Sequence, residues 1–137
     1  MVGFDLGERR VGVAVSDSEG RIAVPHSTVE RAGDAGADVA AMTAVVAELG
    51  AERVVIGLPL GLDGRVGPAA RAALAEAEAL RGALADRNLP VETFDERLTT
   101  VTAERALAES GRHGRARRRV VDRSAAAVML QAWLDAR

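Results

Sequence analysis

Cysteine, lysine and tyrosine are absent from this chain of 137 residues, and only 2% of its residues are aromatic. The absence of cysteine excludes a disulfide framework, a thiolate zinc site and a cysteine nucleophile. Histidine occurs only at His26 and His113, so a histidine metal site or a Ser/His/Asp triad has very few candidates. With so few aromatic side chains, we do not expect recognition of single strands by base stacking.

Long hydrophobic runs are also missing. No apolar run approaches the roughly 18 residues that cross a bilayer, and the first residues do not resemble a signal peptide, so we expect a cytoplasmic protein without membrane contact. Hydrophobic residues make up 48% and charged residues 28% of the chain, which predicts one globular domain over residues 1–137. The net charge of −2 does not indicate general binding to polyanions, although all 18 basic residues are arginine, which suits phosphate contacts.

The hydrophobic pattern changes along the chain from the alternation of strands to the spacing of helices. Strands are predicted at residues 2–6, 11–16, 21–25, 53–57 and 91–95, and helices at residues 39–49, from 68 onward, at 100–110 and from 122 to the C-terminus. Loops rich in glycine are predicted at 57–67 and 111–119. This order predicts an α/β fold with a mixed five-stranded sheet, in which three antiparallel strands precede parallel ones and helices flank the sheet.

Acidic residues follow the ends of two predicted parallel strands. Asp5 ends the first strand, Asp95 and Glu96 lie at the end of the last, and Asp122 begins the final helix. In open α/β sheets, sites form beyond the carboxyl ends of the parallel strands. Carboxylates that converge there would bind a hard divalent cation, which supports displacement at a phosphodiester. Each acid also has an ordinary explanation: a turn for Asp5, solvated charge or pairing with Arg97 for the second group, and an N-cap for Asp122.

Four sequence blocks match one known pattern in order. They are DLGERRVGVAVSD at residues 5–17, VIGLPLGLDG at 55–64, DERLTT at 95–100, and VDRSAA at 121–126 followed by LQAWLD at 130–135. Together they resemble the YqgF family, the Holliday-junction-resolvase-like proteins that are regarded as pre-16S rRNA nucleases. Two features depart from that pattern: Gly61 stands where the family usually has asparagine, and only four residues precede Asp5, so the first strand is expected to be short.

The resemblance implies a ribonuclease H-like fold related to the RuvC resolvases. It also implies a nuclease that uses Mg²⁺ or Mn²⁺ on the 5′ end of the 16S rRNA precursor, alone or on the pre-ribosome. By position, Asp5, Glu96 and Asp122 would be both the catalytic residues and the metal ligands. Adjacent side chains of an extended strand point in opposite directions, so we choose Glu96, which lies just past the strand, and keep Asp95 as the alternative.

Basic and polar residues near these acids are candidates for contact with RNA. Phosphate contacts by such residues give affinity rather than sequence specificity. The candidates for substrate binding are Arg10, Gly57, Arg97, Thr99, Thr100, Arg115, Arg117, Arg118 and Arg119. Each candidate also has a structural alternative. Residues 112–119 could be a solvated loop, and Arg10 and Arg97 could brace the neighbouring acids Asp5 and Glu96. Gly57 could serve loop geometry alone, and Thr99 or Thr100 could be a helix N-cap.

Other functions stay open from the sequence. A resolvase-like DNA nuclease and a non-catalytic regulator that binds nucleic acid are both compatible with the same fold. The segment from Asp5 to Gly7 also resembles the first phosphate loop of the actin and sugar-kinase superfamily, but those proteins enclose ATP between two such domains and 137 residues hold only one. The expected oligomeric state is a monomer or a homodimer.

Overall fold

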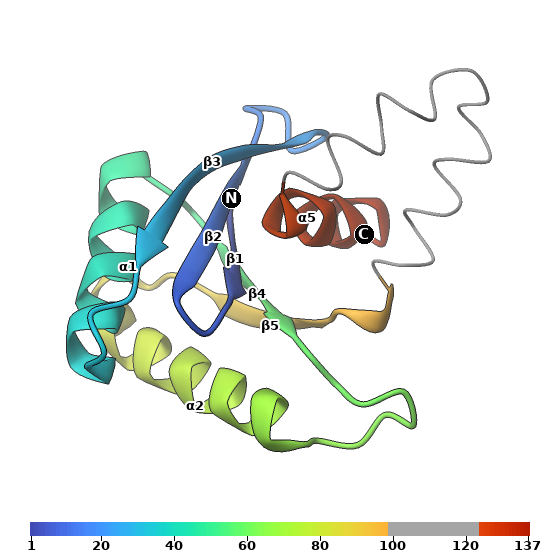
Figure 1. The fold of residues 1–137 in the computed structure, drawn as a ribbon. Helices are drawn as coiled ribbons and strands as arrows, with labels where there is room; N and C mark the ends of the chain where they lie inside the picture. Colours follow the sequence, from blue (N-terminus) through green and yellow to red (C-terminus); the bar gives the residue numbers. More distant parts are fainter. Residues whose placement is uncertain (99–123) are drawn as a thin grey trace.

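The computed structural model describes residues 1–98 and 124–137. A five-stranded sheet in the order β3-β2-β1-β4-β5 forms its centre (Figure 1). The strands are β1 (Val2–Leu6), β2 (Arg10–Ser16), β3 (Ala23–Glu30), β4 (Val54–Leu58) and β5 (Val91–Asp95). β1, β2 and β3 pair antiparallel, whereas β4 and β5 run parallel to β1. The predicted mixed sheet is therefore confirmed in its strand number and directions.

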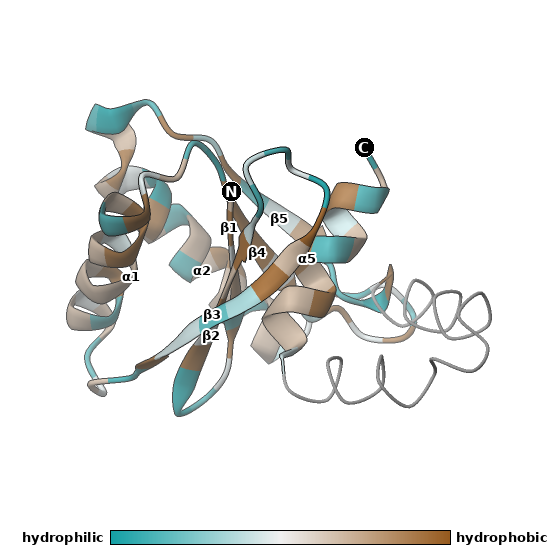
Figure 2. Ribbon diagram, turned by 90° about the horizontal axis from the view of Figure 1, so that it is seen from above, coloured by the Kyte–Doolittle hydropathy of each residue, from teal (hydrophilic) through white to brown (hydrophobic). Residues whose placement is uncertain are grey.

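Helices cover both faces of this sheet, as the views in Figures 1 and 2 show. α1 (Ala35–Leu49) and α2 (Pro68–Ala83), followed by the short 3₁₀ helix η1 (Ala85–Arg87), lie on one face, and α5 (Ala125–Asp135) lies on the other. Phe4 and Ile56 belong to the core under α1 and α2, while Val55 packs with Leu130 in the core under α5. Among the helices of the described ranges, none is long and apolar enough to span a bilayer.

Alternation along β1 sets the direction of Asp5. Val2 and Phe4 are buried in the core under α1 and α2. Gly3 points the other way, where a Cβ atom would lie 3.0 Å from the Cβ of Leu130, so glycine allows α5 to pack closely against the strand. Because side chains two residues apart share a face, Asp5 points toward the α5 side, at the carboxyl end of β1.

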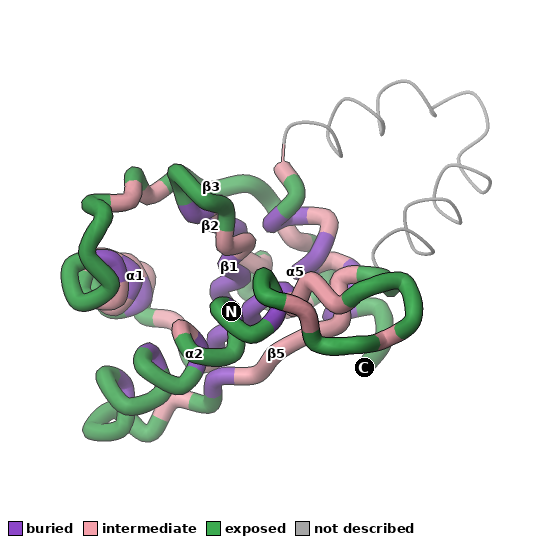
Figure 3. Tube along the Cα trace, turned by 60° about the horizontal axis from the view of Figure 1, so that its bottom comes forward, coloured by how far each residue is buried: buried purple, intermediate pink, exposed green. Residues whose placement is uncertain are grey.

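The third strand differs from its prediction. The sequence predicted a strand over residues 21–25, after the turn at residues 17–20. Instead, β3 runs over Ala23–Glu30. Proline is tolerated on an edge strand, and the pairing with β2 shifts register there: Ala14 opposes Pro25 and Val13 opposes Ser27. Figure 3 shows that β3 is exposed over most of its length at the edge of the sheet.

The start of the last helix also differs from its prediction. The sequence predicted a helix from Asp122, but α5 begins at Ala125. Its N-cap is Ser124, whose hydroxyl accepts a hydrogen bond of 3.0 Å from the backbone N–H of Ala127. Serine and aspartate are equally good N-caps, so composition alone did not distinguish these two positions. The N-cap of α5 is therefore Ser124, and Asp122 lies outside the described residues.

Candidate active site

Two carboxylates meet at the carboxyl ends of the parallel strands. Asp5 is the fourth of the five residues of β1, and Glu96 follows β5 directly. The backbone N–H of Glu96 donates a hydrogen bond of 3.0 Å to the carbonyl of Leu58, which continues the β4–β5 ladder for one residue. This bond fixes the backbone from which the Glu96 side chain extends. Since β4 lies between β1 and β5 in the sheet, the Glu96 side chain must pass over β4 to reach Asp5.

Gly57 of β4 provides the space through which Glu96 reaches Asp5. A Cβ atom on Gly57 would lie 3.0 Å from Cγ of Glu96 and still closer to one of its carboxylate oxygens. Any larger residue at position 57 would therefore displace the Glu96 side chain. The glycine thus has a steric reason to be there, which is distinct from the substrate contact and from the loop geometry that the sequence suggested.

The proximity of the two carboxylates changes the titration of Glu96. Burial of the side chain, the negative charge of Asp5 and a hydrogen bond to Asp5 together raise the pKa of Glu96 to about 7, from an ordinary value of 4.5. The charge of Asp95 adds a smaller effect in the same direction. A hydrogen bond that raises the pKa is one in which the protonated carboxyl donates. Near pH 7, Glu96 is therefore protonated in a substantial fraction of the molecules when no cation is bound.

Asp95 is engaged elsewhere. Nη2 of Arg97 donates to Oδ2 of Asp95 at 2.6 Å, and Nε of Arg97 lies 3.0 Å from both carboxylate oxygens. These bonds hold the pKa of Asp95 below its ordinary value. Nη1 of Arg97 also lies 3.5 Å from the carbonyl of Leu62, so the pair connects the end of β5 to the loop after β4. Of the two adjacent acids, Glu96 is the one that interacts with Asp5.

The structure places some of the predicted substrate-binding residues and does not describe others. Arg10 begins β2 and lines the same groove as Asp5, Gly57 lies under Glu96, and Arg97 braces Asp95. Several of the predicted site residues lie outside the described residues. They are Thr99, Thr100, Arg115, Arg117, Arg118, Arg119 and the third proposed carboxylate, Asp122.

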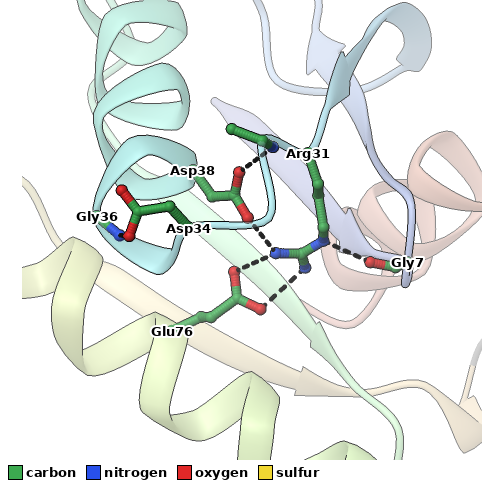
Figure 4. A network of polar contacts seen from close by, with 7 residues as sticks. Gly7, Arg31, Asp34, Gly36, Asp38 and Glu76 are labelled. Carbon is green, nitrogen blue, oxygen red and sulfur yellow. Dashed lines mark hydrogen bonds and ion pairs between the residues drawn. The ribbon is translucent and has the colours of Figure 1, made fainter.

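An arginine that the sequence did not single out supports the turn beside Asp5 (Figure 4). Nε of Arg31 donates to the carbonyl of Gly7 at 2.6 Å. Its two terminal nitrogens contact Asp38 of α1 at 3.1 Å and Glu76 of α2 at 2.9–3.0 Å. Asp38 also accepts a hydrogen bond of 2.8 Å from the backbone N–H of Ala32. The β1–β2 turn is thereby fixed to both helices on the far face of the sheet.

The donor set at this edge suits a hard divalent cation. Carboxylate oxygens are the ligands that Mg²⁺ and Mn²⁺ prefer, and a cation would neutralise the repulsion between Asp5 and Glu96 that raises the pKa of the glutamate. Within residues 1–98 and 124–137, no group of three or more acidic or histidine side chains is arranged to hold a metal. The described part of the site thus offers two ligands.

Comparisons with known proteins agree with this arrangement. The family model described as "RuvX: Holliday junction resolvase" matches residues 1–136. A protein of Nocardia farcinica named "Putative pre-16S rRNA nuclease" is 45% identical over 141 residues, which cover 99% of this chain and 77% of that protein. A protein of the same name from Chloroflexus aggregans is 45% identical over 142 residues, which cover 100% of this chain and 94% of that protein.

One solved structure extends the comparison to three dimensions. The chain titled "T. thermophilus RuvC in complex with Holliday junction substrate" matches with a TM-score of 0.51 and 18% identity, over 72% of this chain and 65% of that one. At this identity the likeness concerns the fold, and it confirms the predicted ribonuclease H-like, RuvC-like architecture. The resemblance found in the four sequence blocks is confirmed as well, and the chain belongs to the RuvX family, also called YqgF.

Proposed function

We propose that this protein is a divalent-metal-dependent nuclease that hydrolyses phosphodiester bonds in the 16S rRNA precursor. The observation that carries the proposal is the pair of Asp5 and Glu96, whose carboxylates interact where the parallel strands end and where substrates bind in such sheets. The choice of the 16S rRNA precursor as the substrate rests on the name "Putative pre-16S rRNA nuclease" that related proteins carry. A cytoplasmic location, a single domain over residues 1–137 and a monomeric or dimeric state belong to the same proposal.

Asp5 and Glu96 would hold the cation, and Asp122 is the proposed third ligand. When bound, Mg²⁺ or Mn²⁺ would polarise the scissile phosphate and favour attack by water. The chain's own contribution is to hold the carboxylates of Asp5 and Glu96 close together. Their electrostatic repulsion would be removed when the cation binds. Glu96 would release its proton as the cation binds, because its raised pKa reflects the burial and negative charge that the cation compensates.

Arg97 and Gly57 would position Glu96 without contacting the cation. The bonds of Arg97 engage the carboxylate of Asp95, so that Glu96 is the acid that interacts with Asp5. The lack of a Cβ atom at Gly57 leaves the space that the Glu96 side chain occupies. Affinity for the RNA backbone would then come from the other proposed substrate contacts, which are those of Arg10, Arg97, Thr99, Thr100, Arg115, Arg117, Arg118 and Arg119.

Dependence on a divalent cation is the first expected result. The purified protein should cleave a transcript of the 16S leader joined to the first part of the mature sequence when Mg²⁺ or Mn²⁺ is present. Excess chelator should reduce the rate to background, and restored Mn²⁺ should recover it. Cleavage that persists at an equal rate in chelator would contradict the proposed mechanism. A four-way DNA junction as a second substrate tests the alternative that the family description names: faster cleavage of the junction than of the RNA would favour it.

Replacement of Gly57 by alanine should lower the cleavage rate by roughly 10- to 100-fold, because misplacing a reactive group by about 1 Å has effects of this size. The new Cβ would displace the Glu96 carboxylate, which is the flexible end of its side chain, so the fold should survive. Gly82→Ala in α2 is the matched control, since a Cβ there meets no atom within 4 Å. The initial rate and the melting temperature of both variants check the prediction. A Gly57→Ala enzyme with the wild-type rate would refute it.

A further inference from the structure

A groove of about 480 Å³ opens directly beside Asp5, on the α5 side of the sheet. It extends from β1 across β2 to the exposed edge strand β3, and the first residues of α5 form its other wall. Its volume lies within the range of roughly 300–1,000 Å³ of pockets that hold small organic ligands. The groove therefore has space for a group of the size of one nucleotide next to the proposed cation site.

The floor of the groove is a row of residues that oppose one another in the sheet. Asp5 opposes Gly12 across β1 and β2, and Gly12 opposes Thr28 across β2 and β3. Directly opposed residues share a face, so glycine in the middle of the row leaves a gap between the two side chains. A Cβ on Gly12 would lie 3.4 Å from the Cβ of Ala126 and 3.7 Å from that of Asp5. Small residues thus keep this passage open.

The outer end of the groove carries a β-bulge. Val13 opposes Ser27 and Ala14 opposes Pro25, so His26 is the extra residue of β3 at the register shift. Bulges redirect side chains and are common beside active sites. Here His26 lines the groove, and its Nδ1 lies 2.8 Å from Oγ of Ser27, which orients the ring. The bulge therefore presents a hydrogen-bonding side chain at the exposed end of the groove.

The polar groups along the groove are of the kind that contact a nucleic-acid backbone. Arg10 forms no ion pair with any acid of the described ranges, so its charge is available to a ligand. Hydroxyl, imidazole and guanidinium groups are frequent donors to phosphate and sugar. The described lining contains no Phe, Trp or Tyr on which a base could stack. The groove is thus suited to contacts with a sugar-phosphate.

We propose that this groove binds the sugar-phosphate of the nucleotide adjacent to the scissile bond, with Arg10 and His26 contacting its phosphate and Thr28 its ribose. The inference rests on the proposed nuclease function. It adds a second binding position for the RNA and the path that the RNA follows across the protein, from Asp5 over Gly12 to β3. His26 and Thr28 become substrate-positioning residues of the same site.

Binding of a single-stranded RNA of about 12 nucleotides from the 16S leader tests the proposal. Fluorescence anisotropy in chelator measures the dissociation constant without cleavage. Arg10→Ala should raise it by about 5- to 20-fold and should reduce the slope of log affinity against log salt by roughly one ion, as expected for a lost phosphate contact. His26→Ala should raise it by about 3- to 10-fold, the effect of one lost hydrogen bond. Arg9→Ala, on the same turn but outside the groove lining, is the matched control and should change it less than about 2-fold.

The outcomes separate this proposal from the proposed function. If the wild-type protein cleaves RNA with Mn²⁺ while Arg10→Ala and His26→Ala bind RNA as the wild type does, the groove proposal is wrong and the nuclease stands. Equal loss for Arg9→Ala and Arg10→Ala would also overturn it, since that result indicates diffuse attraction to the turn. A wild-type protein that neither binds nor cleaves RNA would overturn both. Melting temperatures of all variants establish that each is folded.

Discussion

Replacement of Asp5 by asparagine, or of Glu96 by glutamine, should abolish RNA cleavage and at the same time stabilise the metal-free protein above pH 7. The loss of activity should be about 1,000-fold or more, as for other residues on which a catalytic site depends. The gain in stability has a separate cause, because each substitution removes one of two negative charges that interact within a half-buried site. The combination of lost activity with gained stability distinguishes a functional carboxylate pair from a structural one.

The direction of the pH dependence follows from the raised pKa of Glu96. The folded protein binds the Glu96 proton more tightly than the unfolded chain does, with a pKa of about 7 against an ordinary 4.5. This stabilising contribution is complete below the ordinary value and is lost as the pH rises through about 7. The Glu96 side chain is only half-buried, so solvent screens its interaction with Asp5 and the difference at pH 8 should be roughly 1–2 kcal/mol and no more.

Thermal unfolding in chelator between pH 5 and pH 8 measures this effect. The wild-type melting temperature should fall across the range more steeply than that of either variant, and the curves should converge toward pH 5. Glu48→Gln on the exposed surface of α1 is the matched control and should follow the wild type. A Glu96→Gln protein that is less stable than the wild type at pH 8 would show that the two carboxylates do not repel each other.

Replacement of Arg31 by alanine should reduce the free energy of unfolding by roughly 2–4 kcal/mol, after allowance for solvent at the rim of the network. The guanidinium joins the carbonyl of Gly7 to Asp38 and Glu76, and its side chain is only 16% exposed. Without it, two acids from different helices lose their common partner and the β1–β2 turn loses its anchor. Because that turn follows Asp5 directly, the cleavage rate should fall as well.

Chemical denaturation of Arg31→Ala, Arg31→Lys and Arg71→Ala checks this prediction. Lysine keeps the charge but cannot reproduce the three-way contact of a planar guanidinium, so Arg31→Lys should recover only part of the lost stability. Arg71 lies exposed on α2 and serves as the arginine-to-alanine control. Equal denaturation midpoints for Arg31→Ala and Arg71→Ala would show that the network contributes nothing.

Features of the site that depend on short stretches of sequence were predictable. Asp5 and Glu96 were found because the carboxyl ends of buried apolar runs mark one edge of a parallel sheet. Gly57 was also singled out, but the sequence did not reveal why glycine is needed there. The reason is the side chain of Glu96, which follows the neighbouring strand β5. The sequence favoured Glu96 over Asp95 because Glu96 lies just past the strand, whereas the bonds of Arg97 that engage Asp95 appear only in the structure.

The features that the sequence did not reveal arise from contacts between distant segments. Arg31 lies in the connection between β3 and α1, and its partners Gly7, Asp38 and Glu76 come from three other places in the chain. Residues 26–30 of β3 were not predicted, because their extended conformation depends on pairing with β2 beyond the register shift at Pro25, which the local sequence does not show. The groove beside Asp5 was therefore missed as well, because its lining comes from β1, β2, β3 and α5 and no local sequence pattern indicates it.

Calorimetric titration of Mn²⁺ into the wild-type protein and into Asp5→Asn and Glu96→Gln tests the shared cation site most directly. At pH 6.5, in two buffers of different ionisation enthalpy, the wild type should bind Mn²⁺ and release a proton from Glu96, whereas either variant should bind at least about 10-fold more weakly. The apparent enthalpy should differ between the buffers for the wild type and much less for Glu96→Gln. Equal Mn²⁺ affinity in all three proteins would contradict a cation site built on Asp5 and Glu96.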